Sequence, residues 1–323
     1  MSTAVCLLAY SMVMLVIGPP LLSQVTASGA VPRLGITVWV AAMISVLGAW
    51  LVAVVLFAAD LDRAWGHVDR LLAGCFAALR ALALGGYGGF LQAGLAVLTA
   101  LTVLALGVLG ARVVAALRRS HIHSRRHAEA AQLATRGAPR GPGGSLVVDA
   151  PYRSVYCLGG RPRTIVITRP ALSALDDAQL AAVLAHEQAH LTGRHHLLLA
   201  NTGALAKVLP RLTLFTQGNA EIARLAEMCA DDVAARRHSG DTVVDALLAL
   251  ALPATSAPGS PAPALGAAGF GVAERVERLL APPDSTRARL YHSVVLAGLL
   301  VAPLTLAALI LTRSPLCITA ALG

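Results

Sequence analysis

Three residues near the middle of the chain have the types and the spacing of a hydrolytic metal site. His186, Glu187 and His190 lie in the segment HEQAH. On a helix, residues i and i+4 project from one face about one turn apart, so both imidazoles can bind a single ion. Glu187 stands next to the first histidine and can take a proton from a metal-bound water. The spacing predicts zinc at the two histidines, with Glu187 as the general base.

A later acidic segment, EMCAD, supplies a candidate third ligand. Glu227 and Asp231 are again four residues apart, so they share a helix face. Three protein ligands leave the fourth position of zinc open to water, as catalysis requires. We expect Glu227 to be the third ligand and Asp231 to fix a ligand histidine without itself touching the ion. The alternative is a solvated helix face on which these acids pair with Arg224, Arg236 and Arg237.

Other candidate ligands have simpler explanations. His195 and His196 follow the motif closely and could reach the site, but we expect them to cap or border the helix. Glu221 is expected to face solvent, and Cys229 to be a small core residue. Three more histidines lie in a basic run, which favours contact with anionic lipid over metal binding. They are His121, His123 and His127.

Local patterns predict the elements that position these residues. Asp176 and Gln179 have the spacing of a capping box at the start of the HEQAH helix. Apolar residues then recur with helical periodicity, at Leu180, Val183, Leu184 and Leu191. Before the helix, the β-rich runs 154–158 and 164–168 flank GGRPR, which predicts a hairpin.

The second strand of that hairpin is a candidate binding edge for a substrate. We expect an extended substrate to add beside it, with backbone hydrogen bonds setting the register. The residues concerned are Thr164, Ile165, Val166 and Ile167. No residue offers itself as a donor for the developing oxyanion.

The composition excludes both an ordinary soluble enzyme and a disordered protein. Of the 323 residues, 56% are hydrophobic and 13% charged, and the mean hydropathy is +0.69. Soluble domains carry about 25% charged residues. The net charge of +9 indicates an excess of Lys and Arg on the cytoplasmic side of a membrane, and no nucleic-acid binding is expected.

Four stretches are long and apolar enough to cross a hydrocarbon core, which takes about 20 residues. They are residues 3–22, 34–59, 90–111 and 290–312. The first lacks a basic start and a clear cleavage site, so we expect a retained span and not a signal peptide.

Basic residues set the expected orientation. Several arginines directly follow the third stretch, and Arg287 and Arg289 precede the fourth. By the positive-inside rule, residues 112–289 are cytoplasmic, whereas both termini and the loop 60–89 lie outside.

The fold expected is a mostly α membrane protein with four transmembrane helices and a cytoplasmic α+β metallopeptidase domain inserted between spans three and four. Residues 1–111 form the three-span region, and 112–144 a basic segment and linker. Residues 145–289 form the zinc domain, and 290–323 the fourth span with a short outer tail.

HEQAH followed by EMCAD resembles the gluzincin pattern HExxH…ExxxD of membrane zinc metallopeptidases. The order of spans around the zinc domain is similar to that of the BlaR/MecR-type signal-transducing peptidases. YCLGGRPRTIVIT before the motif and RVERLL after it look like that family's hairpin and trailing helix. We expect the chain to depart from the antibiotic receptors in having no C-terminal penicillin-binding sensor domain.

The resemblance implies one Zn²⁺ per chain in the cell membrane, with a cytoplasmic repressor or the protein itself as substrate. Two alternatives remain beside it: a quality-control protease, which differs only in substrate, and a catalytically silent membrane sensor, which belongs to another class of protein. The intact Glu187 argues against the silent sensor. The near absence of ionisable residues from the predicted spans argues against a transporter.

Overall fold

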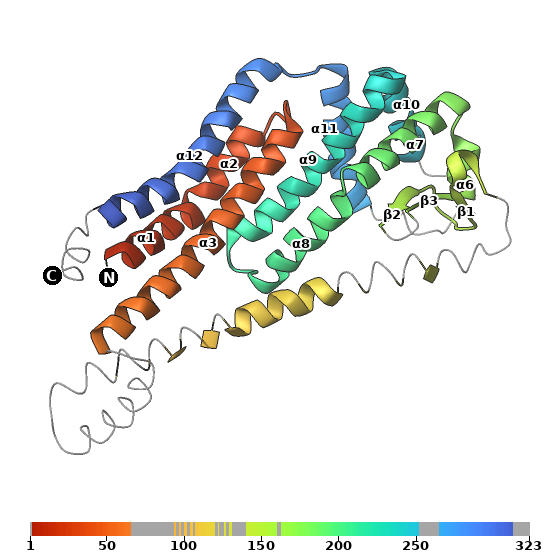
Figure 1. The fold of residues 1–323 in the computed structure, drawn as a ribbon. Coiled ribbons are helices and arrows are strands. Elements are labelled where there is room, and N and C mark those ends of the chain that lie inside the picture. The colour runs from red at the N-terminus through yellow and green to blue at the C-terminus, as the bar shows by residue number, and fades with distance from the viewer. Residues whose placement is uncertain are drawn as a thin grey trace.

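A computed structural model describes residues 2–65, 107–119 with scattered positions between 94 and 130, 140–159, 163–251 and 265–312. Most of the predicted outer loop, half of the third apolar stretch and the three histidines of the basic run lie outside these residues. The described chain is mostly helical, with one small sheet at the end that carries the HEQAH helix (Figure 1).

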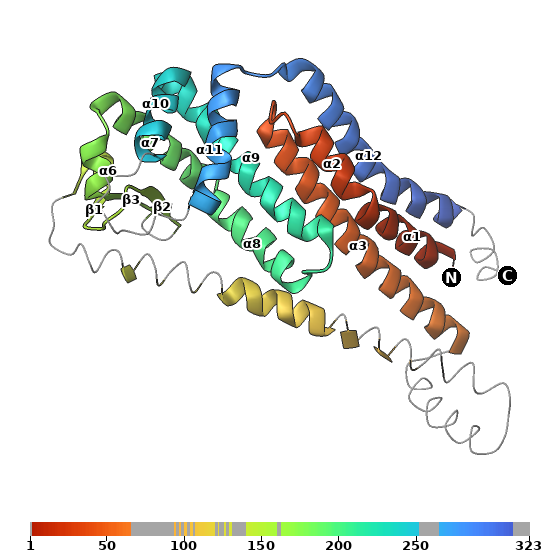
Figure 2. The same ribbon diagram turned by 180° about the vertical axis from the view of Figure 1, so that it is seen from behind.

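Four apolar helices run side by side at the other end, as both views show (Figures 1 and 2). They are α1 (Ser2–Val16), α2 (Gly18–Thr26), α3 (Pro32–Trp65) and α12 (Ser285–Thr312). The first predicted span is not one straight helix, because α1 and α2 meet at a bend of 50°. Prolines occupy the first turn of α2, where they cannot continue the preceding helix but can start a new one.

Within the described residues, Pro32–Leu56 is the helix long and apolar enough to cross a membrane, and the bent pair of α1 and α2 would add a second if it counts as one span. This assignment of spans uses helix length and composition alone. The four transmembrane spans expected from the sequence stay a prediction. The second predicted span is helical throughout, but α3 runs on to Trp65, beyond the predicted start of the outer loop. The fourth predicted stretch lies within α12.

The other end holds the sheet and the shorter helices. A 3₁₀ turn (Pro142–Gly144) leads into β1 (Leu146–Val148), β2 (Val155–Leu158) and β3 (Thr164–Thr168), and α6 (Arg169–Ala174) follows. Then come α7 (Asp177–Thr192), α8 (His195–Val208), α9 (Thr213–His238), α10 (Gly240–Ala251) and α11 (Leu265–Leu280). The predicted hairpin is confirmed, since β2 pairs antiparallel with β3, and Tyr156 lies opposite Val166.

The sheet order corrects one expectation about the hairpin. The order is β1-β3-β2, so β3 is the central strand, with β1 parallel to it on one side and β2 antiparallel on the other. All five β3 residues are buried. Of the residues predicted to form a substrate-binding edge, Val166 and Ile167 pair with both β1 and β2 and so do not lie at a free edge. Thr164 and Ile165 pair with β2, and a substrate beside them stays a prediction. Of the described strands, β2 presents the edge on that side.

One core joins the two ends of the molecule. The first half of α9 packs against α3, and Phe215 lies with its ring centroid 6.5 Å from that of Trp50. Gly218 allows the closest approach, since a Cβ there would stand 2.9 Å from the Trp39 ring and would also overlap the Met43 methyl group. Small residues at such crossings let helix backbones approach closely. Helix α9, which carries the acidic motif, is thus also part of the apolar bundle.

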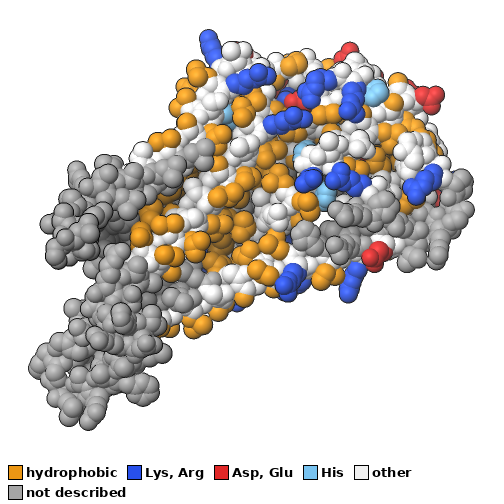
Figure 3. Space-filling model, viewed as in Figure 1, with side chains coloured by type: hydrophobic (Ala, Val, Ile, Leu, Met, Phe, Trp, Pro, Cys, Tyr) orange, Lys and Arg blue, Asp and Glu red, His pale blue; other side chains and the backbone are white. Residues whose placement is uncertain are grey.

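The surface differs between the two ends. In the view of Figure 3, hydrophobic side chains gather over the long helices, whereas Lys, Arg and acidic side chains gather toward the end with the sheet. The sequence agrees, because Arg33 is the only charged residue before Asp60.

Replacing Gly218 by alanine should destabilise the α3–α9 contact. The new methyl group would overlap the fully buried Trp39 ring, and overpacking of this kind costs about 1–3 kcal/mol. Thermal unfolding of the detergent-purified protein, followed by circular dichroism, measures the loss. Gly203→Ala on α8 is the matched control, because a Cβ there has an ordinary contact of 3.5 Å to Asn219. The control should gain up to about 1 kcal/mol from helix propensity. Equal stability changes in the two variants would contradict a tight crossing at Gly218.

Candidate metal centre

Helix α7 begins where the sequence predicts and presents the HEQAH residues to the interior. The Asp176 side chain accepts a hydrogen bond from the Gln179 backbone N–H (2.8 Å), and the Gln179 side chain accepts one from the Asp176 N–H (3.1 Å). This reciprocal pair is the predicted capping box. In the second half of the helix, His186, Glu187 and His190 are all buried.

Helix α9 packs along α7 and brings Glu227 to the two histidines. His186 Nε2 and His190 Nε2 are 3.1 Å apart. Glu227 Oε2 lies 3.4 Å from His186 Nε2, and Glu227 Oε1 lies 3.4 Å from His190 Nε2. The structure therefore gathers, from two helices, the three residues that the sequence proposed as metal ligands.

The spacing of these atoms suits zinc. Ligands bound about 2.0–2.1 Å from a tetrahedral ion are about 3.4 Å from one another, which is close to the separations of 3.1, 3.4 and 3.4 Å found between these atoms. The two nitrogens and one carboxylate are also a donor set that zinc accepts. His186, His190 and Glu227 could thus hold one metal ion.

Each histidine has a second partner on its other ring nitrogen. His186 Nδ1 lies 3.0 Å from Asp231 Oδ1, as expected of Asp231. His190 Nδ1 lies 2.9 Å from the Nδ1 of His195, and one of these two nitrogens donates the proton. Partners of this kind fix the tautomer and the orientation of a ligand imidazole.

The position of His195 differs from the expectation that it caps or borders the helix. Arg194 is the N-cap residue of α8 and adopts a left-handed conformation (φ 53°), so the helical path is interrupted for two residues between α7 and α8. The buried ring of His195 folds back over Gly193, where a Cβ would stand 2.5 Å from its Nε2. The glycine in HLTGRHH is the one sequence signal of this interruption.

The arginine that pairs with the site acids is none of the three that the sequence suggested. Arg275 on α11 contacts both Asp231 and Glu227. Arg224 instead pairs with Glu221 and Glu274, so Glu221 lies in an ion pair and is not simply solvated. Cys229 is a buried core residue, as expected.

Burial and charge set the protonation of the site. Burial lowers the pKa of both histidines: that of His190 falls to about 4, whereas hydrogen bonds to Asp231 and Glu227 raise that of His186 to about 9. Burial raises the pKa of Glu187 to about 7, against the lowering effect of His186. Burial also acts to raise the pKa values of Glu227 and Asp231, but their hydrogen-bonded and charged neighbours hold both at about 2. Glu187 is therefore the acid that can exchange a proton near neutral pH.

Strand β2 lines the site beside Glu187. Burial raises the pKa of the Cys157 thiol to about 12, and the neighbouring Glu187 carboxylate adds to that rise. Cys157 lies on β2, opposite Ile165 of β3. The strand next to the candidate base is thus β2, which the sequence had not distinguished from β3.

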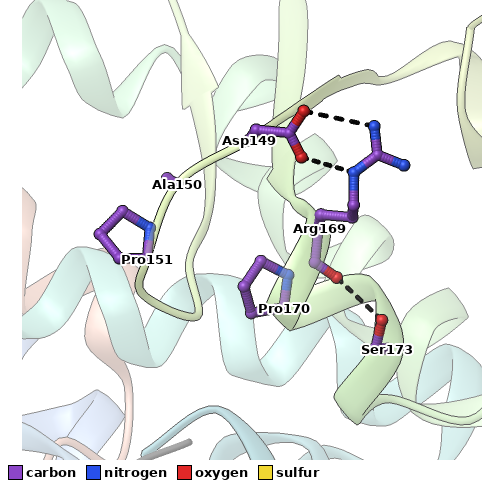
Figure 4. A pocket seen from close by; sticks show the side chains of 6 residues that line it. All are labelled: Asp149, Ala150, Pro151, Arg169, Pro170 and Ser173. Atoms are coloured by element: carbon purple, nitrogen blue, oxygen red, sulfur yellow. Dashed lines mark hydrogen bonds and ion pairs between the residues drawn. The ribbon is translucent and has the colours of Figure 1, made fainter.

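A separate hollow of about 510 Å³ lies at the far ends of β1 and β3. Its wall contains the exposed ion pair of Asp149 with Arg169, the residues 150–151 and the start of α6 (Figure 4). None of the residues of the candidate metal centre lines this hollow, so it is not the place where a peptide would meet the metal.

Comparison with known families agrees with this geometry. Residues 118–257 match the model of peptidase family M48. The match contains both HEQAH and EMCAD, and members of the family are metallopeptidases, generally with zinc. It supports a metallopeptidase without distinguishing the signal-transducing group. No curated protein and no solved structure matches the chain at a significant level.

Replacing His195 by alanine should weaken metal binding. His190 would lose the partner of its Nδ1 atom, and loss of such a partner typically costs about 10- to 100-fold in metal affinity. Competition with a chromophoric chelator measures the zinc dissociation constant. His238→Ala, at the last residue of α9, is the control and should leave it unchanged. An unaltered affinity in His195→Ala would show that this contact does not orient His190.

Proposed function

We propose that the protein is a zinc-dependent endopeptidase held in the cell membrane, with its active site on the cytoplasmic side. One observation carries the peptidase part. His186, His190 and Glu227 converge at separations that fit a zinc ion, and the buried Glu187 follows the first ligand directly. A purely structural zinc site needs no such acid, whereas peptide hydrolysis needs a base for the attacking water.

Zinc bound to these three residues would polarise the scissile carbonyl and acidify the attacking water. Glu187 takes the proton of that water and then delivers it to the leaving amine nitrogen. Burial raises its pKa above the ordinary value of a carboxyl group, which suits a group that both accepts and returns a proton. Asp231 and His195 keep the ligand rings in place during the reaction. An extended substrate adds to the edge of β2, beside Cys157, and its backbone hydrogen bonds set the register.

Three features of the apolar helices support a membrane location. Helix α3 has the length and composition of a span, and Arg33 at its start is the only charge in the first 59 residues. The starts of α3 and α12 lie next to each other. His292 Nε2 on α12 is 3.6 Å from the position that a Cβ on Gly35 of α3 would take. Arg33, Arg287 and Arg289 therefore gather at the end that faces the metal centre, which favours a cytoplasmic site by the positive-inside rule.

The substrate we propose is a cytoplasmic protein, a transcriptional repressor or the chain itself, cleaved in response to a signal. The basis is the resemblance of the motifs and of the order of spans to the BlaR/MecR group. A quality-control protease would use the same chemistry on unfolded membrane proteins. The pattern of products separates the two: one discrete cut indicates signalling, and many cuts in unfolded chains indicate quality control.

Glu187→Gln should keep the metal and lose the activity. The amide cannot accept the proton of the attacking water, and general acid–base catalysis contributes about 10²- to 10⁴-fold in rate. Zinc content by atomic emission and the peptide products by mass spectrometry are measured on wild type and variant purified in detergent. Glu277→Gln on α11 is the control and should cleave normally. Equal cleavage by wild type and Glu187→Gln would contradict the assigned base, and absent zinc in wild type would overturn the metallopeptidase.

The proposed topology predicts different labelling of cysteines at the two ends of the apolar helices. In a cysteine-free background, Ser285→Cys at the start of α12 should react with a membrane-impermeant maleimide only after the cells are opened. Ser2→Cys, at the start of α1, should react in intact cells. Labelling of both positions in intact cells, or release of the protein by alkaline carbonate, would contradict a membrane-spanning chain with a cytoplasmic site.

A further inference from the structure

We infer that Arg275 is a positioning residue for the metal centre: from helix α11 it holds Glu227 and Asp231 where zinc binding requires them. The inference rests on the proposed function. Arg275 lies outside the residues matched by the peptidase family model. The inference is therefore argued from the contacts of Arg275 in this structure.

All three guanidinium nitrogens of Arg275 are engaged with the two acids. Nε donates to Asp231 Oδ2 (2.7 Å) and Nη2 donates to Asp231 Oδ1 (2.6 Å). Nη1 lies 3.2 Å from Glu227 Oε2. The planar fork of an arginine suits this two-point contact, which a lysine cannot reproduce.

Both acids held by Arg275 also contact the same histidine, so the contacts form a closed ring. His186 meets Asp231 through Nδ1 (3.0 Å) and Glu227 through Nε2 (3.4 Å). Arg275 closes the ring from the other side. A displacement of the guanidinium therefore disturbs a candidate ligand, Glu227, directly and another, His186, through Asp231.

Burial makes this pairing necessary. The Asp231 side chain is 1% exposed and that of Arg275 is 13% exposed. Removing one partner of a buried ion pair leaves an uncompensated charge, which is strongly destabilising. Without Arg275, the free energy of the ionised Asp231 rises, and its hydrogen bond to His186 is no longer held at one geometry.

Neighbouring residues of α11 explain why Arg275 stands where it does. Arg278 binds Asp232 of α9 (2.7 Å) and donates from Nε to the backbone oxygen of Gly29 (2.9 Å). Glu274 pairs with Arg224, which itself donates to the backbone oxygen of Thr26 (2.8 Å). Helix α11 is thus fastened both to α9 and to the turn between α2 and α3.

Arg278 provides a matched comparison for Arg275. It lies three residues further on the same helix and also makes a two-point contact with a carboxylate of α9, through Nη1 and Nη2 in place of Nε and Nη2. Within the described part of the chain, however, no hydrogen bond or ion pair joins Asp232 to the two ligand histidines, whereas Asp231 binds His186. A role in docking α11 predicts similar effects at the two arginines, whereas a positioning role predicts an effect on the metal at Arg275 alone.

The test compares Arg275→Lys and Arg275→Gln with Arg278→Lys and Arg278→Gln in the full-length protein. Zinc affinity is measured by chelator competition, the ligand field by the visible absorption of the Co²⁺ form, and stability by thermal unfolding of the metal-free protein. We expect the Arg275 variants to bind zinc about 10- to 100-fold more weakly and to show an altered Co²⁺ spectrum. The Arg278 variants should keep wild-type affinity and spectrum even where their melting temperature falls.

Several outcomes would overturn the inference. Wild-type zinc affinity in the Arg275 variants, or equal losses at both arginines, would reduce Arg275 to a docking residue. If Arg275→Gln does not fold, Arg275→Lys, which keeps a positive charge beside Asp231, supplies the comparison. Failure of the proposed function is distinguishable, because the wild-type protein itself would then bind no zinc.

Discussion

A buried carboxylate with two obligatory partners governs the candidate metal centre. Asp231 is almost fully enclosed, so its charge must be balanced inside the protein. Arg275 supplies a two-point ion pair and His186 a hydrogen bond. Helices α7, α9 and α11 each contribute one of these residues, so their relative placement follows from satisfying a single acid. The orientation of His186, and with it the proposed zinc geometry, depends on that arrangement.

Helix α9 gives this arrangement its rigidity. Its first half packs into the apolar bundle through Phe215 and Gly218, and its second half carries Glu227 and Asp231. Because a continuous helix transmits position along its axis, the metal centre and the apolar helices form one packed unit. Phe215 of the predicted zinc domain thus shares one hydrophobic core with helices of the predicted membrane region.

Local patterns in the sequence were sufficient for the HEQAH helix, its capping box and the β2–β3 hairpin, because each depends on residues close in the chain. The i, i+4 spacing was likewise sufficient to bring forward Glu227 and Asp231. The central place of β3 was not predictable in this way, since it depends on parallel pairing with the three-residue strand β1. Such long-range pairing leaves no periodic signal around Thr164.

Arg275 was missed, and His195 was given another role, for different physical reasons. Arg275 is far from Asp231 in the sequence and reaches it only through the docking of α11. His195 depends on a left-handed Arg194, a conformation that non-glycine residues adopt only rarely and that residue type alone does not reveal. The candidate ligands and the base could thus be predicted from local spacing in the sequence. The residues that support them could not, because they are brought together only by tertiary contacts.

Because α9 is one continuous helix, a rotation at one of its ends displaces residues at the other end. Phe215 and Glu227 lie on one helix, and at a rise of 1.5 Å per residue the distance between them along its axis is about 18 Å. A rigid tilt of about 3° around the Phe215 contact would move the Glu227 backbone by about 1 Å, and a misplacement of about 1 Å can cost about 10²-fold in rate. The angle at which α9 packs against the apolar helices therefore affects the position of Glu227, because even a small change of that angle moves this ligand by a distance that matters for catalysis.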